Sequence, residues 1–394
     1  MENRPAQPLP YGRQHITDED VAAVVATLRS DFLTQGPRVQ EFEEKFATYV
    51  GARYAVAVSN GTAALHLCAL ALNVQPGQRV ITTPITFAAS ANCVRYCGGE
   101  VHFADIDPVT GLIDLQAVRE LLEAHPKGYY TGLIPVDFAG LAVDMEAARA
   151  LADDFGLWLI EDACHAPGGF FVDSQGAQQQ CGSGQLAELA IFSFHPVKHI
   201  ATGEGGMVTT NDEALYHRLR RLRTHGIERE ATGLLRQDEG GWYMEMQELG
   251  YNYRISDILC ALGISQLARA EAGLARRREL AAQYDAAFAA LPGVDVLAPG
   301  RPGHAYHLYV VQVANRRGLY EFLRTNNILT QVHYVPVHRM PYYENLGWKF
   351  GDFPHAEAYY ARCLSLPLYP TLTDAEQAYV IDCVREFMAH NPVA

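Results

Sequence analysis

The chain has 394 residues, of which 49% are hydrophobic and 19% are charged, and its formal net charge is −14. Hydrophobic residues in this proportion can supply a large core, which excludes a disordered chain. The negative charge repels phosphate backbones and anionic lipid surfaces, so we expect neither a nucleic acid nor a membrane as partner. The length predicts two or three domains, or one large domain with an appendage.

The sequence predicts a cytoplasmic protein. Its N-terminus lacks the basic-then-apolar order of a secretory leader. Residues 54–78 are uncharged, but turn residues divide them into pieces far shorter than the ~20 residues a bilayer requires. Most of the eight cysteines lie in apolar runs, as reduced core thiols do. Cys93, Cys97 and His102 lack a fourth ligand at zinc spacing, so no metal site is expected.

Between about residues 50 and 210, short apolar runs alternate with helical periods. The runs show little polar alternation, which is typical of strands covered on both faces. The predicted strands are Ala55–Val58, Arg79–Thr82, Glu100–Ala104, Gly132–Val136, Leu157–Glu161, Ala187–Phe192 and Gly206–Thr210. Helices are expected at Thr62–Leu72, Asp114–Glu123 and Met145–Phe155. This alternation predicts an α/β fold with a mostly parallel sheet in an αβα sandwich.

After about residue 255 the pattern changes and predicts a smaller α+β domain. The expected elements are one long helix over Asp257–Ala290, strands at His307–Val313 and Thr330–Val335, a helix around Leu319–Asn326, and a last helix over Asp374–Met388 capped by Thr373 or Thr371. We place the domain boundary so that residues 1–265 form the large domain and residues 266–394 the small one.

Four segments carry polar or aromatic residues near the C-terminal ends of predicted strands, where open parallel sheets bind ligands. They are Ser59–Thr62, Thr83–Ser90, Glu161–His165 and Ser193–Lys198. Each has an ordinary explanation by itself: a capped turn, a core phenylalanine, a solvated strand end or a surface lysine. Common signatures of phosphate-loop NTPases, zinc proteases and α/β-hydrolases are missing. Gly182–Ala187 fits G-x-G-x-x-A, but a strand follows it where a dinucleotide fold needs a helix.

Together the four segments describe what pyridoxal phosphate requires. A glycine and free N–H groups at a helix start can hold its phosphate, and Phe87 can cover its ring. The carboxylate of Asp162 can pair with the ring nitrogen. A desolvated Lys198 is nucleophilic towards the cofactor's aldehyde.

The chain resembles the sugar aminotransferases of the DegT/DnrJ/StrS family, within the fold-type I pyridoxal-phosphate enzymes. The resemblance covers essentially the whole chain and rests on Leu33–Pro37, Gly61-Thr62, Thr86-Phe87, Glu161–Ala163, Ser193–His195 with Lys198, Gly203–Gly206 and Gly250–Arg254. The S-F-H-x-x-K segment and Gln331–Pro336 look most like the branch that aminates C4 of UDP-linked 4-keto-6-deoxy sugars on the route to pseudaminic acid.

The resemblance implies roles for the matching residues. Lys198 would bond to the cofactor and move protons, Asp162 would pair with its ring nitrogen, and His165, where many relatives have Gln, would lie near its phenolic oxygen. Phe87 would cover the ring. The residues that would hold the phosphate are Gly61, Thr62, Ser193 and, from the neighbouring subunit, Asn252, which implies a homodimer with shared active sites. The residues that would line the sugar-nucleotide pocket are Tyr11, Thr34, His195, Gln331, His333 and Tyr334.

The leading hypothesis is amino transfer from glutamate to C4 of a UDP-linked 4-keto-6-deoxy-N-acetyl-hexosamine. One alternative keeps the cofactor and changes the acceptor to a dTDP- or other nucleotide-linked 3- or 4-keto sugar. Another is a non-catalytic pyridoxal-phosphate-binding regulator, although the sequence leaves no room for a DNA-binding module. Two features carry no assigned role. Arg218–Arg223 belong to a solvated or dimer-facing helix or bind a pyrophosphate, and Phe171–Gln180 are expected to form a surface hairpin.

Overall fold

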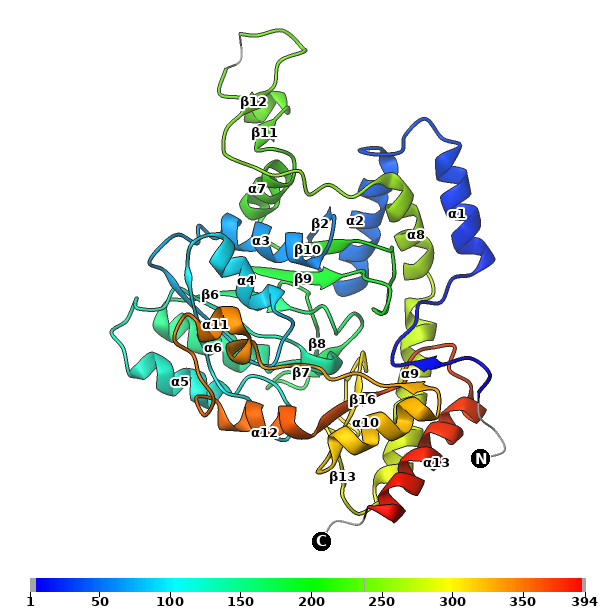
Figure 1. Ribbon diagram of the computed structural model, residues 1–394. Coiled ribbons are helices and arrows are strands. Elements are labelled where there is room, and N and C mark those ends of the chain that lie inside the picture. The colour runs from blue at the N-terminus through cyan, green and yellow to red at the C-terminus, as the bar shows by residue number, and fades with distance from the viewer. Residues whose placement is uncertain (1–4, 237, 392–394) are drawn as a thin grey trace.

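A seven-stranded sheet forms the centre of the computed structural model, which describes residues 5–236 and 238–391 (Figure 1). Its strands, in spatial order, are β2 (Tyr54–Val58), β10 (Gly206–Thr210), β9 (Leu189–Ser193), β6 (Trp158–Asp162), β5 (Gly132–Ile134), β3 (Arg79–Thr82) and β4 (Glu100–Phe103). Of these seven strands, β10 alone runs antiparallel to its neighbours. The predicted mostly parallel sheet and its strands are confirmed.

Helices cover both faces of this sheet, as β2 shows. Val56 and Val58 belong to a core that includes α3 (Gly61–Ala71), whereas Ala55 and Ala57 belong to a second core with α2 (Pro37–Val50). Because neither face meets water, the strands can be apolar along their whole length. The other helices of this part are α1 (Asp18–Leu28), α4 (Ala89–Tyr96), α5 (Leu115–Glu123), α6 (Met145–Phe155) and α7 (Glu213–Arg223).

Two hairpins project from the sheet region. The strands β7 (Phe170–Val172) and β8 (Gln178–Gln180) form the surface hairpin that the sequence predicts. The second hairpin, β11 (Ile227–Glu228) with β12 (Glu245–Met246), lies within residues 225–250, which we call the arm. The arm extends away from the rest of the molecule, at the top of Figure 1.

The C-terminal part has a small sheet and its own core. Its elements are α8 (Asp257–Leu267), α9 (Ala270–Phe288), β13 (Val294–Val296), β14 (Tyr309–Val313), α10 (Arg316–Thr325), β15 (Ile328–Leu329), α11 (Pro341–Glu344), α12 (Pro354–Arg362), β16 (Cys363–Leu366) and α13 (Asp374–His390). A buried cluster joins α9, α10, α13 and this sheet. Leu9 of the N-terminal strand β1 (Leu9–Pro10) belongs to the same cluster, because β1 pairs in parallel with β15. The domain boundary at 265/266 stays a prediction.

Two expectations for the C-terminal half are wrong. The helix expected over Asp257–Ala290 is two helices, α8 and α9, which meet at 57°. The reason is packing: α8 lies on α1 and α2, whereas α9 lies on α13 and β13, and Arg269 at the break binds Asp20. The strand expected over Thr330–Val335 is confined to an isolated bridge between Gln331 and Ser365, since the chain turns there towards the large sheet. The predicted Thr373 cap of α13 is confirmed by a capping box.

No single helix among the described residues is long and apolar enough to cross a membrane. The bent pair of α8 and α9 meets the criterion only when both helices are taken together.

Candidate active site

The ends of two neighbouring parallel strands, β6 and β9, form the centre of the site. Asp162 ends β6 and is 5% exposed. One carboxylate oxygen accepts a hydrogen bond from the Ser90 hydroxyl at 2.7 Å, and the other accepts one from the Cys164 N–H at 3.2 Å. Ser90 itself pairs with the Thr86 hydroxyl at 2.8 Å. These donors hold the Asp162 carboxylate in one orientation at the sheet edge.

Lys198 follows β9 in a partly buried turn, where its backbone N–H donates to the carbonyl of His195 at 2.8 Å. Burial lowers the pKa of Lys198 to about 8, although the neighbouring Cys164 and Asp162 partly oppose this shift. Near neutral pH, a larger fraction of this side chain is therefore the unprotonated amine than in an ordinary lysine. An amine in this state can attack a carbonyl carbon, which an ordinary surface lysine does poorly.

His165 is held by two hydrogen bonds that determine its tautomer. Its Nδ1 accepts the N–H of Ala139 at 3.2 Å, and its Nε2 lies 3.1 Å from the hydroxyl of Tyr334. Burial lowers the pKa of His165 well below its usual value, so the ring is neutral. A neutral ring that accepts at Nδ1 carries its proton on Nε2 and donates it to the Tyr334 oxygen. The Tyr334 hydroxyl can then donate its own hydrogen towards a ligand.

The start of α3 provides a place for a phosphate. Asn60 caps the helix by accepting the N–H of Ala63 at 2.8 Å, and Gly61 is the first helical residue. A Cβ at Gly61 would lie 3.0 Å from the Cβ of Ser193 and 3.4 Å from its hydroxyl oxygen. The glycine therefore keeps open the space between the helix start and the end of β9. Free N–H groups there, with the adjacent Thr62 and Ser193 hydroxyls, suit an anion.

A group of aromatic side chains gathers beside Lys198 and Asp162. The ring of Tyr334 lies 6.3 Å from that of Phe87, and the ring of His333 lies 4.9 Å from that of Tyr11. Phe87 is 62% exposed, so its ring is accessible to a ligand. His195 is also exposed, beside Ser193. The structure brings these residues together, and their roles in covering the ring and contacting the sugar stay predictions.

Three predicted site residues lie in other surroundings. Thr34 bridges Ser256 before α8, and Asn252 bridges Thr224 at the base of the arm. Gln331 bridges Ser365, and its side chain accepts the N–H of its neighbour Val332. A cavity of about 650 Å³ between α2, α7 and the arm is lined by Gln35 and Arg254, from the segments of Thr34 and Asn252. These two segments therefore face an open space instead of this chain's own Lys198.

The arginines of α7 are paired with acidic residues. Arg218 lies against Glu248, Arg221 against Glu228 and Arg223 against Glu43. These partners neutralise the positive charge locally, which favours the interpretation of α7 as a structural helix over a pyrophosphate-binding surface.

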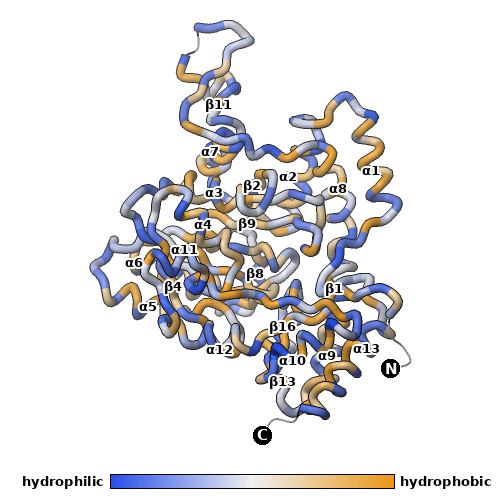
Figure 2. The backbone as a smooth tube through the Cα atoms, in the orientation of Figure 1, coloured by the Kyte–Doolittle hydropathy of each residue, from blue (hydrophilic) through white to orange (hydrophobic). Residues whose placement is uncertain are grey.

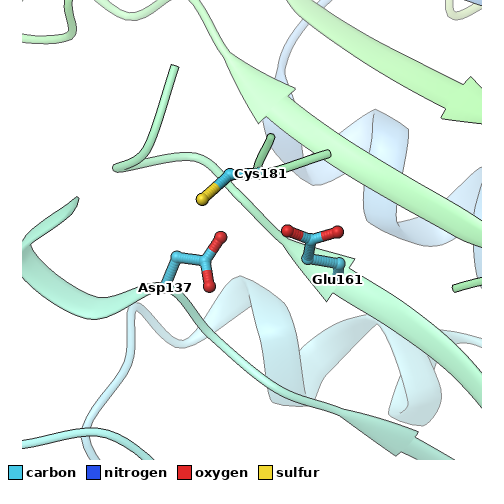
Figure 3. A group of neighbouring side chains, drawn as sticks. All are labelled: Asp137, Glu161 and Cys181. Atoms are coloured by element: carbon cyan, nitrogen blue, oxygen red, sulfur yellow. The ribbon is translucent and has the colours of Figure 1, made fainter. Parts of the chain in front are cut away.

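A buried acidic group lies directly behind Asp162. Figure 3 shows the carboxyl groups of Asp137 and Glu161 and the thiol of Cys181 facing one another. One carboxylate oxygen of each acid and the Cys181 sulfur all lie within 4.8 Å of one another. Burial raises the pKa of Asp137 to about 7, and burial together with Asp137 raises the pKa of Glu161 well above its usual value. These three groups could bind a metal ion. A proton shared by the two carboxyl groups, however, also reduces their buried negative charge, and it does so without a metal ion. We interpret it as a carboxyl pair that shares a proton.

Sequence reasoning missed Ser90, His307 and the partner of Glu161, Asp137. Each acts across a long sequence separation: Ser90 binds Asp162, and His307 Nε2 lies 3.4 Å from Lys198 Nζ. For Asp137 a signal was present, because a carboxylate that follows an apolar strand of the same sheet should meet Glu161 at the shared edge.

The site fits pyridoxal phosphate on structural grounds. The oriented carboxylate of Asp162 suits the ring nitrogen, and the lowered pKa of Lys198 suits the aldehyde. The helix start at Gly61 suits the phosphate, and the exposed Phe87 suits the ring. With the seven-stranded sheet, this site defines a pyridoxal-phosphate-dependent aminotransferase.

The chain belongs to the DegT/DnrJ/EryC1/StrS aminotransferase family, whose model matches residues 14–385. It is 41% identical over 391 residues to the spore coat polysaccharide biosynthesis protein SpsC of Bacillus subtilis, covering 96% of this chain and 97% of that protein. Among solved structures it is similar to Helicobacter pylori PseC, an aminotransferase involved in pseudoaminic acid biosynthesis. The TM-score is 0.87 at 29% identity, with 98% of this chain and 100% of that chain covered. It is also similar to S. venezuelae DesV, with a TM-score of 0.85 at 31% identity and with 97% of this chain and 99% of that chain covered.

Proposed function

We propose that the protein transfers an amino group from glutamate to C4 of a UDP-linked 4-keto-6-deoxy-N-acetyl-hexosamine. The observation that carries the amino-transfer part is Lys198, a lysine of lowered pKa beside the oriented carboxylate of Asp162. The proposed sugar acceptor is supported by the adjacent aromatic side chains of Tyr11, His333 and Tyr334 and by the structural similarity to PseC. The relative SpsC, named for spore coat polysaccharide biosynthesis, also supports a sugar acceptor.

When bound, pyridoxal phosphate supplies an electron sink that stabilises negative charge on the carbon that loses a proton. The chain's residues do the rest. Lys198 Nζ takes and returns the proton, since its lowered pKa leaves the amine free to accept it. Asp162 orients the ring through its nitrogen, and His165 holds the Tyr334 hydroxyl towards the ligand. Gly61, Thr62 and Ser193 hold the phosphate at the start of α3.

We infer a homodimer in which each chain completes its partner's site. Thr34 and Asn252 lie on segments that face an open cavity, and large apolar side chains are exposed nearby. On the arm these are Leu235, Trp242, Met244, Met246 and Leu249. Figure 2 shows that α1 also carries a hydrophobic run, in which Val21 and Leu28 are more than half exposed. A second copy of the chain would bury these surfaces and bring Asn252 to the partner's phosphate site.

The proposed location is the cytoplasm. Cys68, Cys93 and Cys260 are buried free thiols, which persist in a reducing compartment.

The visible absorption spectrum of the purified protein, recorded before and after addition of L-glutamate, tests the donor reaction. We expect a band from the lysine-bound cofactor that disappears with glutamate and returns with the UDP-linked keto sugar. A band indifferent to glutamate would contradict the proposed donor. The acceptor is tested by comparing turnover of the UDP-linked sugar with that of dTDP-linked 3- and 4-keto sugars. A higher kcat/KM for a dTDP-linked sugar would overturn the proposed substrate and support the alternative.

A further inference from the structure

We propose that His307 is a positioning residue for Lys198: it holds the amine of this lysine whenever Lys198 is not bonded to another molecule. The inference rests on the proposed function, because it takes Lys198 as the lysine that bonds to the cofactor. During each half of a transamination this lysine must be released, act on a proton and be captured again. A released lysine on a flexible side chain needs a partner that keeps Nζ near the reacting atoms.

The geometry that carries the proposal is the contact between Lys198 Nζ and His307 Nε2, at 3.4 Å. His307 comes from the segment before β14, so the contact joins the C-terminal part of the chain to the end of β9. The His307 side chain is 4% exposed, and its Nδ1 has no hydrogen-bond partner among the described residues. Without Lys198 this buried ring would have no hydrogen-bond partner among the described residues. Proteins generally avoid buried polar groups that lack a partner.

The neighbouring histidines are committed to other bonds. His165 uses Nδ1 for the Ala139 N–H and Nε2 for Tyr334. His199 donates from Nε2 to the carbonyl oxygen of Ala305 at 2.8 Å. The His307 ring packs against both, with ring centroids 4.3 Å from His165 and 5.9 Å from His199. These two rings fix the plane of His307, so its Nε2 stays directed at Lys198.

The charge of the surroundings determines which way the hydrogen bond points. The titratable and charged groups that face Lys198 are Asp162, Cys164, His165, His199, His307, His333 and Arg277. Burial, followed by the charge of Lys198, lowers the pKa of His307 well below its usual value, so this ring is neutral. A neutral Nε2 accepts a hydrogen bond from the ammonium form of Lys198 and stabilises that form. Removing this acceptor should therefore lower the pKa of Lys198 further.

The test measures the protonation of Lys198 directly, in the full-length chain after the cofactor has been removed. Trace acetic anhydride labels unprotonated amines, and mass spectrometry of the Lys198 peptide at pH 6–10 gives the midpoint of its titration. His307→Leu removes the acceptor, and His307→Gln retains one of similar reach. His102→Leu is the matched control, since His102 is a partly buried histidine on β4.

We expect the midpoint to fall by about one pH unit in His307→Leu, a tenfold change in the ratio of free amine to ammonium at a given pH, and to stay near the unaltered value in His307→Gln and the control. An unchanged midpoint in His307→Leu, or an equal fall in His307→Gln, would overturn the proposal. Should the leucine variant fail to fold, His307→Asn replaces it, because its shorter amide cannot reach Nζ.

A second measurement separates this proposal from the proposed function. The cofactor-loaded protein is reduced with borohydride and its peptides are mapped. Cofactor attached to a lysine other than Lys198 would overturn the role of Lys198, whatever His307 does. Attachment to Lys198 together with an unchanged titration in His307→Leu would overturn only the role of His307.

Discussion

The ends of β6 and β9, which we call the wall, and the arm of residues 225–250 differ in how completely a single chain covers their side chains. In the wall, Asp162 is 5% exposed and every oxygen of its carboxylate has a donor from the same chain. On the arm, Trp242 is 84% exposed, and Leu235 and Leu249 are also mostly exposed. The wall is complete within one chain, whereas the arm carries apolar area that a single chain leaves in water. The proposed homodimer would bring the wall of one chain and the arm of the other together.

The largest expected effect tests whether the wall holds the chemistry. Lys198→Ala should lower turnover by at least about a thousandfold, because no other described residue at the site can both bond to the cofactor and move the proton. Steady-state rates with the keto sugar and glutamate measure it. The exposed Lys127→Ala serves as control and should keep the unaltered rate. Normal turnover in Lys198→Ala would remove the wall from the mechanism.

The next effect concerns the buried carboxyl pair behind the wall. The folded-state pKa of Asp137, about 7, is raised above the ordinary value of about 3.9, so its stabilising contribution is full below about pH 4 and is lost as the pH rises towards 7. Asp137→Asn cannot ionise and should remove most of this loss, which reaches about 1.4 kcal/mol per pH unit. Urea unfolding from pH 4 to pH 8 measures it. The exposed Asp238→Asn should retain the slope of the unaltered protein. An identical slope in Asp137→Asn would show that the pKa of Asp137 is not raised in the folded protein.

A smaller effect sharpens the assignment of the phosphate site. In Gly61→Ala the new methyl group would meet the Ser193 side chain at 3.0 Å and narrow the space at the start of α3. We expect the Kd for pyridoxal phosphate to rise about tenfold, or about 1.4 kcal/mol, in an absorbance titration. Gly273→Ala on α9 is the matched control, because a methyl group there meets only the Pro370 side chain at 3.5 Å, an ordinary contact distance. Equal affinity in the two variants would place the phosphate elsewhere.

The smallest effect on the single chain is expected at the arm. Trp242→Ser should change the free energy of unfolding of one chain by less than about 0.5 kcal/mol, since the side chain is exposed. It should nevertheless weaken the dimer, raising its dissociation constant several-fold in sedimentation equilibrium. Val109→Ser, an exposed apolar residue outside the arm, should leave the dimer unchanged. If Trp242→Ser and Val109→Ser behave alike, the arm is not part of the interface.

The sequence predicts most of the wall and little of what supports it. The strands are recognisable because residues such as Val56 and Ile160 continue apolar runs. Asp162 ends one such strand, and Lys198 lies five residues after the end of another. Ser90 contacts Asp162, and His307 contacts Lys198, from distant parts of the chain. No local sequence pattern predicts such contacts. The break between α8 and α9 carries no glycine or proline. It exists because the two helices pack on different cores, which only the folded structure reveals.

The pairing of β1 with β15 joins two segments that are synthesised at very different times. Leu9 is synthesised more than 300 residues before its partner Ile328. At about 5–20 residues per second this delay lasts on the order of half a minute. During that time Tyr11 has no strand pairing to hold it beside His333. The strand that pairs with the segment next to Tyr11 is therefore translated long after it, and a truncated chain that ends before residue 328 would lack this pairing.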